Sequence, residues 1–120
     1  MITRIVAGAV VVLALVLPVG PGEAADVAKG RKLNVQNCEK CHGKTGKGDG
    51  ALLKRMKADV KPVDWTDKAA MAKWTDADMT KIIKEGGTSA GRSKVMPSYG
   101  EKMSDGDVAD LVAYIRSLAK

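Results

Sequence analysis

One short motif constrains this chain more than any other feature. Residues 38–42 are Cys38-Glu39-Lys40-Cys41-His42, which follows the pattern Cys-x-x-Cys-His. This spacing is the attachment signature of a c-type haem. On one helical turn, two cysteines three apart reach the two vinyl groups of a porphyrin, and the next residue projects its imidazole toward the iron. We therefore predict one haem c, bound covalently through Cys38 and Cys41, with His42 as an iron ligand.

Three other interpretations of two closely spaced cysteines are less consistent with the sequence. A redox-active dithiol of this type normally lies in a βαβ unit, and no such unit is predicted here. A zinc site needs about four protein ligands, whereas the chain has two cysteines and one histidine. A disulfide across three residues would close a very short loop and so constrain little unfolded-state entropy.

The first 25 residues have the layout of a secretory signal peptide. A positive start at Arg4 precedes an unbroken apolar run over 5–17, and small residues with two prolines follow over 18–25. Cleavage after Ala24 fits best, with Ala25 as the alternative. An uncleaved membrane anchor would need roughly 20 apolar residues, and this run is shorter. We predict residues 1–25 as the signal peptide, 26–120 as one domain, and a periplasmic or otherwise secreted mature protein without stable membrane insertion.

The mature part is predicted to be all-α, because no segment alternates like a β-strand for more than a few residues. Thr75 and Ser104 each begin a capping-box-like sequence before an apolar-periodic stretch. Four glycines in residues 43–50 predict a loop. We expect about four to five helices around one haem. The candidate helices lie in 26–37, 51–57, 66–74, the stretch from Thr75 to Gly86, and the stretch from Ser104 to Leu118. Residues 60–63 are expected to be extended, and 88–100 to be a turn-rich loop.

The second axial ligand is constrained by the single histidine. Because His42 is the only one, bis-histidine ligation and a Ser-His-Asp triad are both excluded. The sixth ligand must then be methionine, lysine, water or nothing. Met96 lies in a predicted loop directly before Pro97, and this loop is long enough to reach the far haem face, so we predict Met96. The other mature methionines are better explained by packing or by their position near helix ends: Met56, Met71, Met79 and Met103.

The surface charge indicates protein partners rather than nucleic acid. Removal of Arg4 and Glu23 with the leader leaves the net charge at +6, and no basic run exceeds two residues. Nucleic-acid binding would need a basic stripe with aromatic residues. A moderate positive charge suits steering toward a redox partner with an acidic surface, or toward an anionic membrane face. The candidate docking residues around the haem edge are Lys40, Lys44, Lys47 and Lys94.

Over essentially its whole mature length the chain resembles class I cytochromes c of the small bacterial monohaem kind. The matching residues are Gly30, 37–43, 46–50, Met96-Pro97-Ser98-Tyr99-Gly100 and 111–115. The resemblance implies that the first and last helices cross, with Gly30 meeting Tyr114 and Leu111 beside it.

Two local features follow from the same resemblance. The family usually has an aromatic residue four positions after the glycine of the crossing. Here that residue is Asn34, which should weaken the crossing or shift its packing onto Leu33. The resemblance also implies that the backbone near Pro62 accepts a hydrogen bond from the second ring nitrogen of His42.

Taken together, these features predict an electron-transfer protein rather than an enzyme. Histidine and methionine together saturate the iron, which leaves no open position for oxygen or peroxide and favours one-electron transfer. Two alternatives stay open. One is a haem enzyme or sensor with a labile sixth ligand, and the other is an electron-accepting subunit of a larger oxidoreductase complex.

Overall fold

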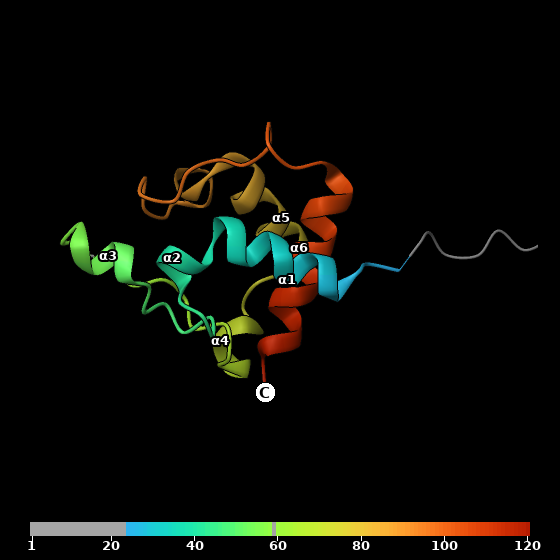
Figure 1. Cartoon of the computed structure of the whole chain (residues 1–120), viewed down its shortest axis with the longest axis horizontal. Helices are drawn as coiled ribbons and strands as arrows, with labels where there is room; N and C mark the ends of the chain where they lie inside the picture. The colour runs from blue at the N-terminus through green and yellow to red at the C-terminus, as the bar shows by residue number, and fades with distance from the viewer. Residues whose placement is uncertain (1–23, 59) are drawn as a thin grey trace, which may run out of the picture.

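The crossing of the first and last helices organises the fold (Figure 1). The computed structural model describes residues 24–58 and 60–120, in which α1 (Val27–Asn37) packs against α6 (Asp105–Leu118). The helices approach most closely at Gly30, where a Cβ atom would lie 2.0 Å from the carbonyl oxygen of Asp110 and 2.9 Å from the Cβ of Tyr114. The predicted contact between Gly30 and Tyr114 is confirmed.

Asn34 is buried at this crossing rather than turned to solvent. Its side chain lies on the same face of α1 as Gly30 and is only 2% exposed, and its Oδ1 has no hydrogen-bond partner in the described part of the chain. Leaving such a group buried and unpaired costs roughly 1–3 kcal/mol. Leu33 packs against the core, and the predicted shift of the crossing's packing onto it stays a prediction. Leu111 and Tyr114 of α6 belong to that core, while position 34 supplies no aromatic side chain to it.

The remaining elements are short, and the all-α prediction is confirmed. They are α2 (Glu39–His42), α3 (Ala51–Arg55), α4 (Lys68–Met71), α5 (Asp76–Glu85) and a 3-10 turn, η1 (Gly87–Ala90). No β-strand occurs in the described residues. The described part holds six α-helices rather than four or five, because the haem-attachment turn forms a helix of its own. Residues 1–23 of the predicted signal peptide lie outside the described residues, so the leader and the domain boundary stay predictions.

Both predicted capping boxes are present. The Thr75 hydroxyl accepts from the Asp78 N–H, while the Asp78 carboxylate accepts from the Thr75 N–H, at 3.0 Å in each direction. Ser104 and Asp107 form the same pair at the start of α6. The loop predicted over 88–100 differs at its beginning, where residues 87–90 form η1. Gly86 ends α5 with a positive φ, and the Ser89 N–H then donates to its carbonyl and begins a new turn.

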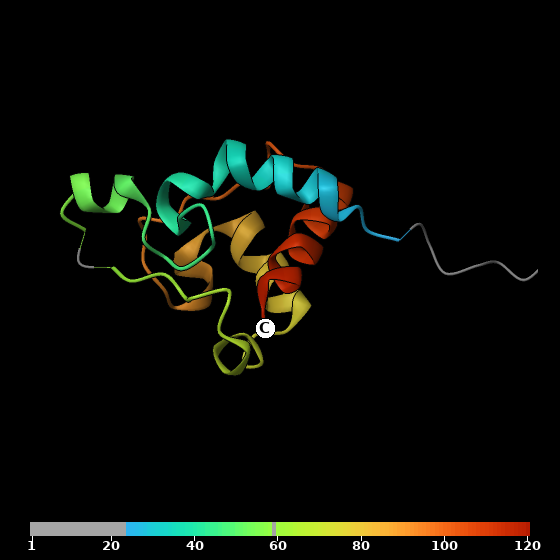
Figure 2. The same ribbon diagram turned by 60° about the horizontal axis from the view of Figure 1, so that its bottom comes forward.

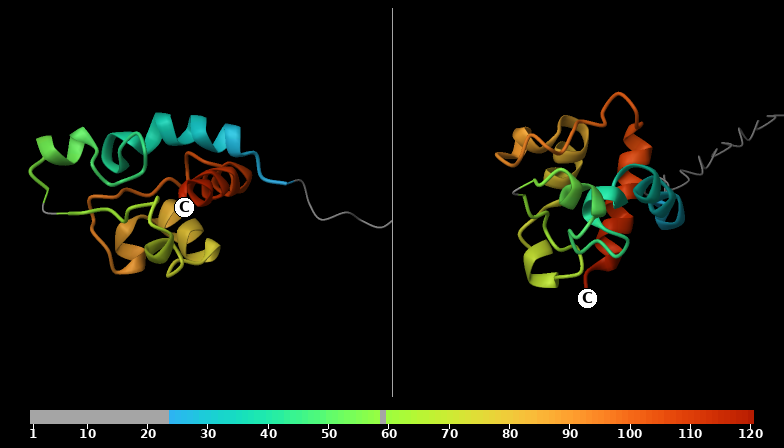
Figure 3. Two further views of the ribbon diagram at one scale, coloured as in Figure 1. Left: turned by 90° about the horizontal axis from the view of Figure 1, so that it is seen from below. Right: turned by 60° about the vertical axis from the view of Figure 1, so that its left-hand side comes forward.

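Two groups of helices enclose the centre of the molecule. Figures 2 and 3 show α1, α2 and α3 along one side, with α4, α5 and η1 on the other. The corner between α4 and α5 is fastened to α6 by Arg116. Its Nε donates to Asp76 at 2.8 Å, its Nη1 to the Met71 carbonyl at 3.0 Å, and its Nη2 to the Trp74 carbonyl. These bonds hold the segment that carries Met71 and Trp74 against α6.

Within residues 24–58 and 60–120, no helix is both long and apolar enough to cross a membrane.

Candidate functional site

The Cys-x-x-Cys-His motif forms one continuous helical turn. Cys38 ends α1, and its carbonyl accepts from the Cys41 N–H at 3.1 Å and from the His42 N–H at 2.9 Å. Both cysteines are free thiols. The turn brings Cys38, Cys41 and His42 to one wall of the same pocket, as expected from their spacing.

The glycine-rich loop after the motif folds back onto this turn. The Gly48 N–H donates to the His42 carbonyl at 2.8 Å, and the Gly50 N–H donates to the Cys41 carbonyl at 3.0 Å. Further along the chain, the Trp65 N–H donates to the Gly46 carbonyl at 2.8 Å. Residues 43–50 thus connect the attachment turn to the extended segment that follows residue 60.

Burial holds two of the site residues in their neutral forms. It raises the pKa of the Cys38 thiol to about 12, with a smaller contribution from neighbouring Cys41. It lowers the pKa of His42 to about 4. At neutral pH Cys38 is therefore a protonated thiol and not the reactive thiolate of a redox dithiol. His42 is a neutral imidazole, which is the form that binds a metal.

The His42 ring is held by stacking and not by the predicted hydrogen bond. Its centroid lies 4.2 Å from that of Trp65, with an angle of 17° between the ring planes. The Nδ1 atom is buried and has no hydrogen-bond partner among the residues that the structure describes, so the predicted bond to the backbone near Pro62 is absent from them. The carbonyl of Pro62 instead lies against Gly48, where an added Cβ would come within 2.8 Å of it. The stacked indole thus supplies the lateral contact that the prediction assigned to the carbonyl.

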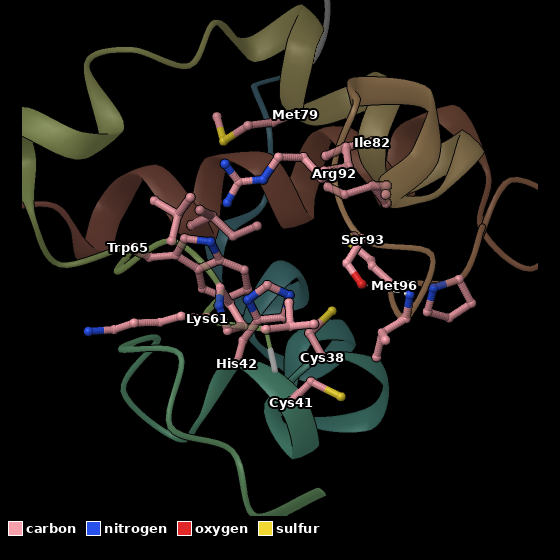
Figure 4. Close-up of a pocket in the computed structure, with 18 of the residues that line it drawn as sticks. Cys38, Cys41, His42, Lys61, Trp65, Met79, Ile82, Arg92, Ser93 and Met96 are labelled. Carbon is pink, nitrogen blue, oxygen red and sulfur yellow. Dashed lines mark hydrogen bonds between the residues drawn. The ribbon is translucent and has the colours of Figure 1, made fainter. Parts of the chain in front are cut away.

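All four predicted site residues line a single pocket. Met96 reaches it from the segment after η1, while Cys38, Cys41 and His42 reach it from the attachment turn (Figure 4). The Met96 carbonyl accepts from the Gly87 N–H at 3.0 Å, which ties this segment to η1. Most of the other lining residues are apolar, among them Leu53, Val60, Pro62, Val63, Trp65, Trp74, Ile82, Ile83, Val95, Pro97, Tyr99 and Ile115.

Met96 is one of three methionines on the pocket wall. Met71 and Met79 also line it, but they belong to the buried core and are 2% and 4% exposed. Met96 packs against the edge of that core and is partly exposed. Met56 lies outside the core at 52% exposed, and Met103 is buried beside the start of α6.

Several pocket residues were not identified from the sequence. Trp65 and Trp74 are the only tryptophans in a chain without phenylalanine. Their scarcity is the sequence feature that could have pointed to them as pocket residues. Lys61 and Arg92 are cationic residues on the pocket wall, and the Arg92 guanidinium lies 5.7 Å from the centroid of the Trp74 ring. The predicted docking residues are all exposed and lie outside the pocket lining: Lys40, Lys44, Lys47 and Lys94.

The residues present fit a covalently bound haem. Two free thiols, a neutral imidazole and a thioether meet in one largely apolar pocket, and these donor types suit thioether attachment and axial ligation. Among the described residues, no group of three or more histidine, cysteine or acidic side chains is placed to hold a metal ion.

Comparison with known proteins gives a consistent result. The family model described as cytochrome c matches residues 27–119. Cytochrome c6 of Picosynechococcus sp. is 31% identical over 120 residues, covering 98% of this chain and 95% of that protein. The cbb3-type cytochrome c oxidase subunit FixP of Bradyrhizobium diazoefficiens is 30% identical over 93 residues, covering 78% of this chain but only 28% of the subunit. The solved structure of the KustC0563 c-type cytochrome superposes with a TM-score of 0.59 at 27% identity, covering 76% of this chain and 98% of that one.

Proposed function

This chain belongs to the cytochrome c family and carries electrons on a covalently bound haem c, and we propose which of its residues hold that haem. Cys38 and Cys41 would hold the haem through the two thioethers, and His42 and Met96 would bind its iron. The observation that carries this proposal is the convergence of all four side chains on one apolar pocket. Bound there, haem c supplies a one-electron couple at its iron.

The protein residues determine how that couple is used. The buried walls of the pocket exclude water, and burial keeps His42 neutral and ready to ligate. The soft thioether sulfur of Met96 favours the ferrous state and so raises the reduction potential. With both His42 and Met96 bound to it, the iron would have no position left for oxygen or peroxide. The chain therefore acts as a carrier of single electrons and not as an enzyme.

The mature carrier works outside the cytoplasm. The leader over residues 1–25 directs secretion and is removed, which leaves a periplasmic or otherwise secreted protein with no stable membrane insertion. Its redox partners present acidic surfaces, because the net charge of this chain is +6 and the lysines at 40, 44, 47 and 94 are all exposed. Such complementarity steers transient encounters.

One observation favours a second role. The similarity to FixP, which is a subunit of a larger oxidase, agrees with a stable place for this chain in an oxidoreductase complex. The native mass of the protein purified from its own cells distinguishes the two roles. A mass near that of one mature chain supports the free carrier, and a larger stoichiometric assembly supports the subunit.

Replacing Met96 with alanine tests the ligand assignment. Haem should stay attached, because Cys38, Cys41 and His42 are unchanged. The reduction potential should fall, because water or lysine is a harder ligand than a thioether. An exchangeable site should also open, which binds cyanide or carbon monoxide quickly and can be followed by absorption spectroscopy. The weak absorption band of the methionine–ferric bond near the red end of the spectrum should disappear.

Met79→Ala is the matched control, because Met79 lines the same pocket but lies in the core. It should cost roughly 2–5 kcal/mol of stability and leave that absorption band intact. Met56→Ala, at an exposed position, should change neither the stability nor the absorption band. Loss of the band in Met79→Ala but not in Met96→Ala would show that the wrong methionine was assigned. If no methionine variant altered the band, a haem enzyme or sensor with a labile sixth site would become the better interpretation.

A further inference from the structure

The tryptophan stacked on His42 has a role beyond filling the pocket. We propose that Trp65 is a positioning residue that sets the orientation of the His42 imidazole and stabilises the oxidised state of the couple. The two rings are nearly parallel, with centroids 4.2 Å apart, and Trp65 is only 8% exposed (Figure 4). This inference rests on the proposed ligation of the iron by His42.

The indole is itself held from a second direction. The backbone N–H of Trp65, not its indole, donates to the Gly46 carbonyl at 2.8 Å. A Cβ on Gly46 would come within 3.0 Å of the indole Cε3 and 3.2 Å of the Trp65 Cβ, so the loop packs directly against the indole, and the Gly46 backbone has a φ of +80°. Glycine therefore suits this position both by conformation and by space. Because the same loop also bonds the His42 carbonyl through the Gly48 N–H, it ties the backbones of Trp65 and His42 to one another.

His42 needs such a contact because it lacks the usual alternative. A ligating histidine is normally oriented by a hydrogen bond from its other ring nitrogen. Here Nδ1 is buried and finds no hydrogen-bond partner within the described ranges 24–58 and 60–120. The torsion angle about the bond between Cβ and the imidazole has a broad distribution, so the ring can rotate easily. Stacking on the face of a fixed indole restricts that rotation without a hydrogen bond.

The indole face also has an electrostatic consequence. The face of an aromatic ring is negative and attracts positive charge, and tryptophan attracts it most strongly. An imidazole bound to ferric iron carries more positive charge than one bound to ferrous iron. Trp65 therefore stabilises the oxidised form more than the reduced form, and it lowers the reduction potential relative to an aliphatic residue at the same place.

Trp65→Leu tests both parts of the proposal in the holo protein. The equilibrium constant for reduction should rise at least about threefold. This corresponds to a rise of about 28 mV in the reduction potential, since a tenfold change is about 59 mV for one electron. The g values of the oxidised protein in electron paramagnetic resonance, which depend on the orientation of the ligand plane, should shift. Trp65→Phe keeps an aromatic face, so it should shift the potential in the same direction by less than half as much. Val112→Ala, in the core but outside the pocket lining, should change neither quantity.

Fluorinated tryptophan provides a test that keeps the fold. Fluorine withdraws electron density from the indole face while nearly preserving its shape. Incorporation should raise the potential of the parent protein and leave that of Trp65→Phe unchanged, although Trp74 is fluorinated in both. An unchanged potential in fluorinated parent protein, or a lower potential in Trp65→Leu, would overturn the electrostatic part of the proposal. Unchanged g values in Trp65→Leu would overturn the positioning part.

These results are separable from a failure of the ligand assignment. Each variant is compared only while it keeps the low-spin absorption spectrum of the parent, so a negative result concerns Trp65 alone. If His42→Gly kept that same spectrum, His42 would not be the ligand. The ligation on which the inference rests would then fail independently of any result at Trp65.

Discussion

Replacing Gly30 with alanine should destabilise the holo protein, because the two terminal helices touch at that residue. The added Cβ would lie 2.0 Å from the carbonyl oxygen of Asp110, 2.6 Å from the carbonyl carbon and 2.9 Å from the Cβ of Tyr114. Two of these atoms are backbone and the third is fixed to it, so no flexible side chain can move aside. The helices must separate instead.

The expected magnitude follows from two opposing effects. Forcing an extra carbon into a packed interface typically costs about 1–3 kcal/mol. Alanine in place of glycine within a helix returns about 0.5–1 kcal/mol. Because all three contacts are shorter than 3.0 Å, the cost should lie near the upper end of its range, and the net loss should be roughly 2 kcal/mol. Each kcal/mol corresponds to about 4–8 °C in melting temperature for a domain of this size. Separation should also weaken the ion pair between Lys29 and Asp107, now 2.7 Å apart.

Denaturant unfolding of the holo protein, followed by circular dichroism, measures this loss. Gly106→Ala is the matched control, because it lies in the first turn of α6, where an added Cβ meets only the Ser104 hydroxyl at 3.8 Å. That variant should be as stable as the parent or slightly more so. If Gly30→Ala were as stable as Gly106→Ala, close approach at Gly30 would not be what organises the crossing.

Two further predictions concern charge. Electron transfer to an acidic protein partner should slow as salt rises, because the Debye length falls from about 10 Å at 0.1 M to about 3 Å at 1 M. If the rate measured by stopped flow did not change with salt concentration, the net charge of +6 would be incidental to partner binding. Bonds from the Thr75 backbone to Asp78 and from Lys29 to Asp107 lower the pKa of each carboxyl below its ordinary value of 3.8. The stability that these two ionised carboxylates give the folded protein is fully present above their ordinary pKa. It is lost as the pH falls through their lower pKa in the folded state. Helical circular dichroism should therefore decline below about pH 4, and less steeply in Asp107→Asn.

Local features of the fold were predictable to within a few residues. The helix starts at Thr75 and Ser104 depend on side chains three residues apart, and both capping boxes are present as predicted. Short elements were less predictable. The expected helix over 66–74 reduces to Lys68–Met71, and the loop after Gly86 begins with a 3-10 turn. Such segments have too few internal hydrogen bonds to determine their own ends, so packing decides them.

Packing at the helix crossing was only partly predictable. The resemblance led us to expect contact between Gly30 and Tyr114, and the contact is present. It did not indicate that Asn34 would be buried with an unpartnered oxygen. An isolated Asn34 favours water, but its position four residues after Gly30 places it on the buried face of α1. The geometry of the helix therefore overrides the preference of the side chain.

The local sequence predicts the chemistry of the site and accounts for the single helical turn that presents it. Cys38, Cys41 and His42 lie within five residues, so a local helical turn is enough to bring them together. The tertiary structure alone decided which distant residues meet that turn. It stacked Trp65 on His42, left Nδ1 without a partner among the described residues, and placed Lys61 and Arg92 on the pocket wall. These contacts join segments that have no local periodicity or spacing in common, and their geometry is set only when all the helices pack together.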